Sequence, residues 1–117
     1  MDDRYRAEVI GLARWQPTLL HIFESTSGAS GYSLDDLTDG FARGGPQSLR
    51  YGRRVGAVVA HDIGCPVAIL SVWLGVSHRT AHQWVTPGNY QRDRVHPRSV
   101  ELVYEAMTPT FLRVVEP

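Results

Sequence analysis

Five side chains between residues 77 and 83 share the ability to hydrogen-bond a base edge or a phosphate. They are Ser77, His78, Arg79, His82 and Gln83. Arginine reads guanine O6 and N7 with two hydrogen bonds and glutamine reads adenine N6 and N7, and each good pair contributes roughly 1–3 kcal/mol of discrimination against the wrong base. On a helix that begins at residue 78, these positions lie on the outward side. The segment therefore predicts a surface that reads DNA.

The residues around this segment match the steric demands of a helix-turn-helix. Within residues 67–86, the tight turn needs a residue that adopts the left-handed conformation at the ninth position, where Gly75 stands. The close crossing of the two helices needs a small side chain at the fifth position, where Ser71 stands. The inward-facing positions are all apolar: Leu70, Leu74, Val76, Ala81 and Trp84. The pattern predicts two helices joined at Gly75.

Residues 74–84, LGVSHRTAHQW, resemble the helix-turn-helix of bacterial and phage repressors. The wider stretch of about residues 48–107 is similar to the five-helix DNA-binding domain of the λ repressor and Cro-like family. In that family a tryptophan ends the recognition helix, a glycine-containing loop follows, and a further helix starts at a proline. Trp84, Gly88 and Pro97 occupy these places.

The resemblance implies a role for each polar residue of the second helix. Four side chains face base edges in the major groove, and two lie near phosphates. The residues that face base edges are His78, Arg79, His82 and Gln83, and the two near phosphates are Ser77 and Thr80. The chain departs from the family at two places: Val67 stands where members often carry a phosphate-contacting glutamine, and the loop over residues 86–96 is longer.

The arginines are concentrated in the middle of the chain. The net charge is zero, with 12 arginines, no lysine and 12 acidic residues. Residues 1–40 hold three arginines against seven acidic residues (−4), residues 41–98 hold eight against two (+6), and residues 99–117 hold one against three (−2). A basic stretch of this kind is the electrostatic footprint of a phosphate-binding surface. We therefore expect phosphate contacts from Arg92, Arg94 and Arg98, with Arg53 and Arg54 in addition.

Residues 1–46 are predicted to form an acidic helical segment, distinct from the rest of the chain. Apolar residues recur at helical spacing from Asp2 to Phe23, but Pro17 interrupts them, so we expect one broken helix or two short ones. Residues 25–30, STSGAS, are typical of a turn or linker. A short helix capped by Ser33 follows, and the Gly-Gly-Pro sequence that ends it marks the expected domain boundary.

Residues 47–117 are predicted to form the helix-turn-helix DNA-binding domain. Gly64 is placed to end its first helix as a left-handed cap. No stretch of alternating residues requires a strand, so the expected fold class is all-α, a compact multi-helix domain with an extra N-terminal helical segment. The expected helices run from Gln47 to Asp62, from Pro66 to Leu74, from His78 to about Val85, and from Pro97 to Pro109.

Residues suited to other chemistry lack the partners that such chemistry needs. Cys65 is the single cysteine, which excludes an intrachain disulfide, and no base is matched to it. His78 and His82 have the spacing of a two-histidine metal site, but no third ligand accompanies them. No apolar run approaches the roughly 20 residues that span a bilayer, and the start of the chain is acidic. We expect no enzymatic activity, metal, cofactor or membrane partner, and a cytoplasmic location.

These patterns together favour a sequence-specific double-stranded-DNA-binding transcriptional repressor of prokaryotic or phage type. A single helix-turn-helix buries too little surface for tight specific binding, so we expect a homodimer that occludes a promoter with recognition helices about 34–36 Å apart. Residues 1–46 are the candidate dimerisation or protein-partner element. Two alternatives stay open: a DNA-binding accessory subunit of a phage recombination or packaging machine, and a helix-turn-helix-based protein-interaction module.

Overall fold

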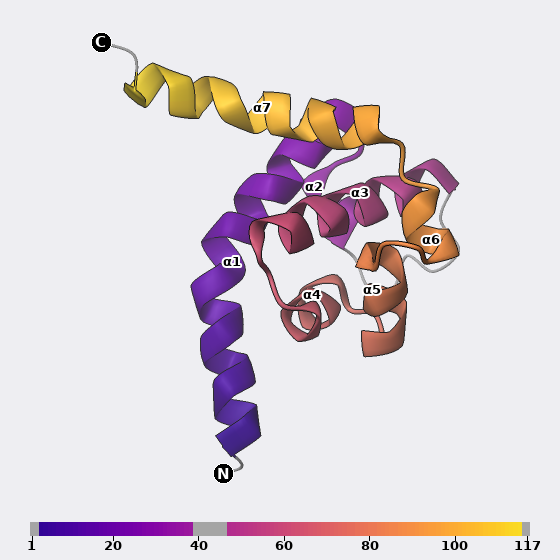
Figure 1. The fold of residues 1–117 in the computed structure, drawn as a ribbon. Coiled ribbons are helices and arrows are strands. Elements are labelled where there is room, and N and C mark those ends of the chain that lie inside the picture. Colours follow the sequence, from indigo (N-terminus) through magenta and orange to yellow (C-terminus); the bar gives the residue numbers. More distant parts are fainter. Residues whose placement is uncertain (1–2, 39–46, 116–117) are drawn as a thin grey trace.

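The computed structural model describes the backbone of residues 3–38 and 47–115, with the side chains of residues 10–38 and 47–107, and all regular structure in it is helical (Figure 1). The all-α class expected from the sequence is confirmed. The elements are α1 (Asp3–Ser30), α2 (Leu34–Thr38), α3 (Gln47–Ile63), α4 (Val67–Leu74), α5 (His78–Val85), α6 (Tyr90–Asp93) and α7 (Pro97–Val115).

α1 is one helix of 28 residues, although the sequence predicted a break at Pro17 and a linker at residues 25–30. The carbonyl of Ala13, which loses its helical partner at Pro17, belongs to an exposed residue, so water can bond it. Near the end of α1, the hydroxyls of Ser25 and Thr26 donate to carbonyls one turn earlier, at 2.9 and 2.8 Å. Both predicted interruptions are wrong because the packing of α1 against α3, α4 and α7 outweighs local propensity.

α2 begins as the sequence predicted. The Oγ of Ser33 accepts a hydrogen bond from the backbone N–H of Asp36 at 3.1 Å, which caps the helix. Leu37 is completely buried and ties this short helix to the core. The Gly-Gly-Pro sequence at residues 44–46, which was expected to end it, lies outside the described residues.

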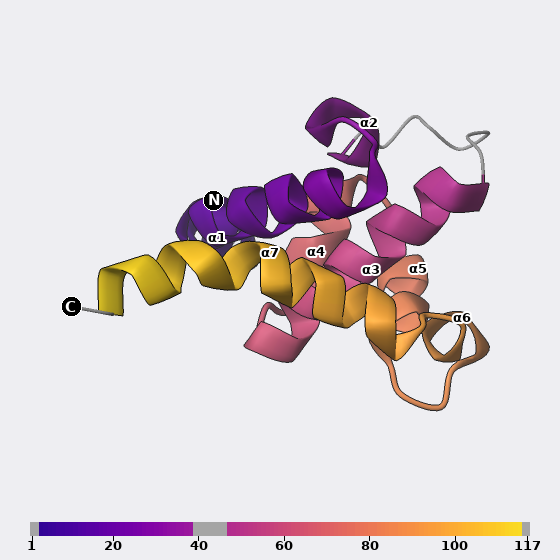
Figure 2. The same cartoon turned by 90° about the horizontal axis from the view of Figure 1, so that it is seen from above.

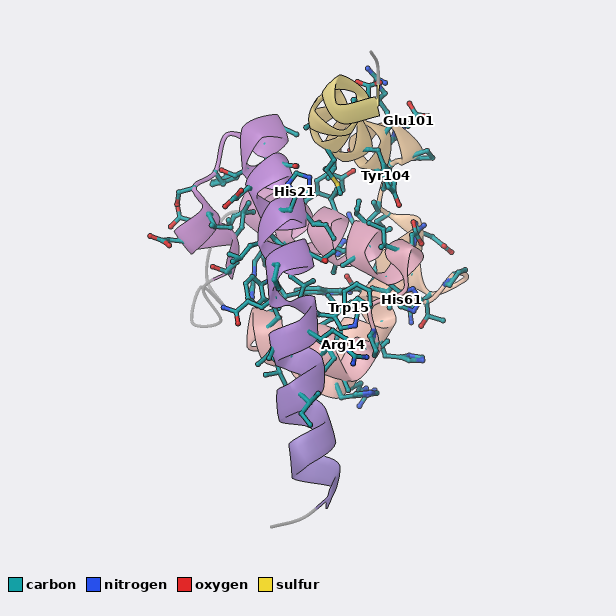
Figure 3. The ribbon with its side chains drawn as sticks, turned by 90° about the vertical axis from the view of Figure 1, so that its left-hand side faces the viewer. Arg14, Trp15, His21, His61, Glu101 and Tyr104 are labelled. Carbon is teal, nitrogen blue, oxygen red and sulfur yellow. The ribbon has the colours of Figure 1, made fainter. Side chains whose placement is uncertain are left out.

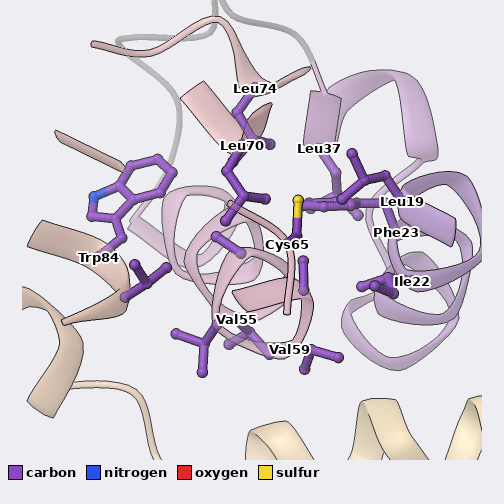
Figure 4. Packing of buried hydrophobic residues seen from close by; sticks show 14 of the residues in the cluster. Leu19, Ile22, Phe23, Leu37, Val55, Val59, Cys65, Leu70, Leu74 and Trp84 are labelled. Atoms are coloured by element: carbon purple, nitrogen blue, oxygen red, sulfur yellow. The ribbon is translucent and has the colours of Figure 1, made fainter. Parts of the chain in front are cut away.

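One hydrophobic core joins the chain on both sides of the expected domain boundary (Figure 4). The helices before residue 46 contribute Leu19, Ile22, Phe23 and Leu37, each completely buried. These side chains pack with residues of α3, α4 and α5 in the same cluster. α4 and α5 therefore share their core with the N-terminal helices.

The crossing of α1 and α3 depends on a glycine. A Cβ built on Gly56 of α3 would lie 2.6 Å from the ring of Phe23, closer than carbon atoms pack. The absence of a side chain at residue 56 allows the Phe23 ring to lie directly against the backbone of α3.

The helices of the C-terminal part begin close to the predicted residues. Gly64 ends α3 with a φ of 116°, and Pro66 is the N-cap of α4 where we expected it at the first helical position. The long loop predicted over residues 86–96 contains the short helix α6, capped by Asn89, whose Oδ1 accepts from the N–H of Gln91 at 2.9 Å.

α7 begins at Pro97, as predicted, but does not end at Pro109 and runs on to Val115. The carbonyl left without a helical partner by Pro109 belongs to Glu105, an exposed residue that water can reach. Figures 1 and 2 show α7 crossing the C-terminal half of α1 and then extending beyond it.

Candidate nucleic-acid interface

α4 and α5 are joined by a turn of three residues, 75–77, in the order of helix, turn and helix that the sequence predicted. Gly75 adopts the left-handed conformation with φ 65° and ψ 32°, which a side chain would strain. Ser77 caps α5, because its Oγ accepts a hydrogen bond from the N–H of Thr80 at 3.0 Å. The predicted turn and its glycine are confirmed. The predicted inward-facing side chains are buried or half-buried: Leu70, Leu74, Val76, Ala81 and Trp84.

The four predicted base-reading side chains lie on the outer side of α5. His78, Arg79 and His82 are exposed and Gln83 is half-buried, whereas Ala81, Trp84 and Val85 of the same helix are buried. Among the described residues, the guanidinium of Arg79 has no hydrogen-bond or ion-pair partner. An α-helix with its side chains is about 10–12 Å in diameter, so a major groove about 12 Å wide admits it.

Ser77 and Thr80 stand together at the start of α5. The hydroxyl of Ser77 donates to Oγ1 of Thr80 at 2.9 Å, in addition to capping the helix. Both residues therefore have a structural role. The start of a helix also carries free N–H groups and a partial positive charge, which favour a nearby phosphate.

Arg53 does not lie where the sequence placed it. It is 4% exposed, its Nε donates to the carbonyl of Leu37 at 2.9 Å, and its Nη2 donates to the carbonyl of Leu74. Its guanidinium carbon lies 5.8 Å from the ring centre of Trp84. Arg53 therefore joins α2, α3 and the end of α4 inside the protein, and the prediction that it contacts phosphate is wrong because the side chain is buried and hydrogen-bonded.

The three arginines after α5 have different surroundings. Arg92 is half-buried with no partner for its guanidinium among the described residues, and Arg94 donates to the hydroxyl of Tyr90 at 2.7 Å. Arg98 donates from Nη1 to Glu105 at 2.9 Å and to Glu101 at 3.1 Å, and these bonds raise the pKa of its guanidinium. Two carboxylates thus neutralise Arg98, whereas no carboxylate of the described residues does so for Arg92 or Arg94.

Arg54 and Arg94, both predicted to bind phosphate, meet in a pocket of about 480 Å³ between α3 and α6. The sequence reasoning did not select Arg50 as a site residue, although it lines the same pocket. Its spacing of four residues from Arg54, which places both on one helix face, was the available signal. The complete lining is Gln47, Ser48, Arg50, Tyr51, Arg54, Gln91 and Arg94.

The other residues considered for chemistry are placed apart from this surface. Cys65 is buried, and burial raises the pKa of its thiol to about 12, so it stays neutral near pH 7. No group of three or more potential metal ligands occurs in residues 10–38 and 47–107. None of the helices described is both long and apolar enough to cross a membrane.

The side of the molecule covered by α1 lies away from α5 and α6 (Figure 3). Arg14, Trp15 and His21 of α1 lie on this side, with Tyr104 of α7 beyond them. Burial and the nearby charge of Asp62 raise the pKa of Tyr104. Arg14 is exposed here and provides a cation remote from the candidate interface.

Comparison of the chain with models of known protein families, with curated proteins and with solved structures found no match.

Proposed function

We propose that this protein binds double-stranded DNA in a sequence-specific way through α5 and represses transcription. The observation that carries the proposal is the outer side of α5, where Arg79 lies exposed and unpaired among the described residues, with His78 and His82 beside it. The inner side of the same helix is fixed in the core, so these polar groups are held in a defined direction. An arginine in this setting can form the two-bond contact with guanine.

Three arginines near the edges of α5 are suited to contact phosphate, and they support the proposed DNA binding. Arg92 and Arg94 of the following segment and Arg54 of α3 supply positive charge that no carboxylate of the described residues neutralises. Such contacts position a protein on the duplex, and base contacts supply the specificity. The proposal leaves out Arg53, which is buried, and assigns Arg98 no major role, because two glutamates pair with it.

The proposed active form is a homodimer in the cytoplasm that covers a promoter. Two recognition helices about 34–36 Å apart would enter successive major grooves, and the bound dimer would exclude the polymerase. Much of α1 is already committed to the core through Leu19, Ile22 and Phe23. A second copy would therefore dock on the part of α1 that precedes them, where Ile10 is 61% exposed.

Selection from a randomised duplex library tests the proposal. The selected duplex and a scrambled one, both fluorescently labelled, are titrated by anisotropy over a salt series. We expect one enriched, palindromic sequence and an affinity for it that falls steeply with salt.

Arg79→Ala and Arg14→Ala form the matched pair for this experiment. Both remove one exposed arginine, but only Arg79 lies on α5. Loss of discrimination in the Arg79 variant alone supports the proposal. Failure to enrich any sequence, with weak binding even at low salt, contradicts it and favours a protein-interaction module. Sedimentation as a monomer both free and on DNA contradicts the dimer.

A further inference from the structure

The pocket between α3 and α6 gathers three arginines and, among the residues that the structure describes, no carboxylate. Arg50 and Arg54 point from one face of α3, and Arg94 stands at the end of α6 across the pocket. The side-chain amides of Gln47 and Gln91 belong to the same lining. Every charged group in this lining is positive, so the pocket attracts anions.

Arg54 has an unmet hydrogen-bonding requirement. Its side chain is half-buried, and its Nε is buried with no hydrogen-bond partner among the described residues. Burial, followed by the charges of Arg94 and Arg50, lowers the pKa of its guanidinium. An arginine nonetheless stays protonated near neutral pH. An anion in the pocket would accept hydrogen bonds from the terminal nitrogens of the guanidinium groups and relieve the repulsion among the three cations.

The walls of the pocket are held in place by hydrogen bonds. The hydroxyl of Tyr51 shares a hydrogen bond with Oγ of Ser99 at 2.7 Å and accepts one from the N–H of His96 at 3.0 Å. Arg94 donates from Nη1 to the hydroxyl of Tyr90, and its guanidinium carbon lies 5.2 Å from the centre of that ring. Arg94 keeps further N–H donors for a ligand. Groups that are fixed before binding lose less entropy when a ligand arrives.

We propose that this pocket binds a phosphate group through Arg50, Arg54 and Arg94. The forked donors of guanidinium groups match the oxygens of phosphate and bind them with charge-assisted hydrogen bonds. The phosphate belongs either to the backbone of DNA or to a free phosphorylated small molecule. A volume of about 480 Å³ accommodates more than a phosphate ion and lies in the range usual for small-molecule sites. The DNA source rests on the proposed function, and the small-molecule source is independent of it.

The first arm of the test titrates the full-length protein with inorganic phosphate and with adenosine 5′-monophosphate. The readout is the Nε–Hε resonance of Arg54 in nitrogen–proton correlation spectra, with sodium chloride at equal ionic strength as the reference. We expect a saturable shift with the phosphate compounds and none with chloride. Arg50→Gln should weaken their binding about tenfold, because it removes a charge-assisted hydrogen bond.

The second arm measures the affinity of Arg54→Gln for the selected duplex over a salt series. A backbone contact at the pocket lowers the slope of log affinity against log salt by about one. Arg98→Gln is the matched control, because it removes an arginine that is paired with two glutamates outside the pocket. Circular dichroism checks that each variant is folded, and the exposed Arg50 provides a second variant if Arg54→Gln is not.

The two arms separate this proposal from the function proposed above. A phosphate shift without any DNA binding supports the pocket and contradicts the DNA-binding function. A slope change without a shift supports the pocket with the DNA backbone as its source. If neither phosphate nor the monophosphate shifts Arg54, and neither Arg50→Gln nor Arg54→Gln changes the salt slope, the proposal is overturned.

Discussion

The arginines in two regions of the molecule differ in their partners. One region consists of α5, α6 and the first turns of α3, and the other is the start of α7. Arg79 has no partner among the described residues, and Arg54 shares its pocket with two other arginines. Arg98 lies within 3.1 Å of two carboxylates on its own helix. All three residues look alike in a count of charge along the chain. The charge available to an outside anion therefore depends on what each guanidinium already contacts.

Arg53 and Arg54 make the same point within one helix. The two residues are neighbours in the sequence, but consecutive positions on an α-helix are about 100° apart. This rotation turns Arg53 into the core, where it is 4% exposed, and leaves Arg54 at the pocket with an Nε that bonds none of the described residues. Arg53 consequently contributes to stability, and Arg54 to the surface potential.

The largest effect is expected from Arg53→Met. The substitution leaves the carbonyls of Leu37 and Leu74 without their buried donor, so we expect the free energy of unfolding to fall by about 3 kcal/mol. Urea denaturation measures this change. Arg50→Met, on an exposed position of the same helix, should leave the stability unchanged. Equal stability of the two variants would remove the distinction between buried and available cations.

Arg79→Ala should leave the stability nearly unchanged and reduce DNA discrimination. Loss of a two-bond contact with guanine lowers the preference for the selected duplex over a duplex changed at that base pair by roughly 1–3 kcal/mol, or about 5- to 150-fold. Anisotropy titrations with the two duplexes measure it. An unaltered preference would show that Arg79 does not read a base.

Arg92→Ala should weaken binding to all duplexes alike. A phosphate contact carries no sequence information, so we expect similar losses for selected and scrambled DNA and a salt slope smaller by about one. The same titrations over a salt series provide the measurement. A loss confined to the selected duplex would instead assign Arg92 to base contact.

The smallest effect is expected from Arg98→Ala. Its charge is already balanced by Glu101 and Glu105 at the surface, and exposed ion pairs contribute little to stability. Thermal unfolding and the salt slope of DNA binding should both match the unaltered protein. A slope reduced as much as that of Arg92→Ala would mean that DNA displaces the two glutamates, and the comparison between the two regions would fail.

The features predicted most accurately are those that a few neighbouring residues decide. The cap at Ser33, the glycine that ends α3 and the turn at Gly75 were predicted and are confirmed. The burial of the inward side of α5 follows from helical periodicity in the same way. Continuity of α1 through Pro17 was missed, because the lost hydrogen bond and the ring clash of a proline are local, whereas the packing energy that offsets them comes from other helices.

The sequence by itself thus determined the helical class, the capped turn between α4 and α5, and the polar outer side of α5. These features depend on backbone conformation and hydrogen bonds within a few residues of each other. Only the tertiary structure decided that Phe23 lies under α3, that Arg53 is buried, and that Arg94 meets Arg50 and Arg54. Those contacts join helices that are distant along the chain, and the packing of the whole core selects among the faces that each helix offers.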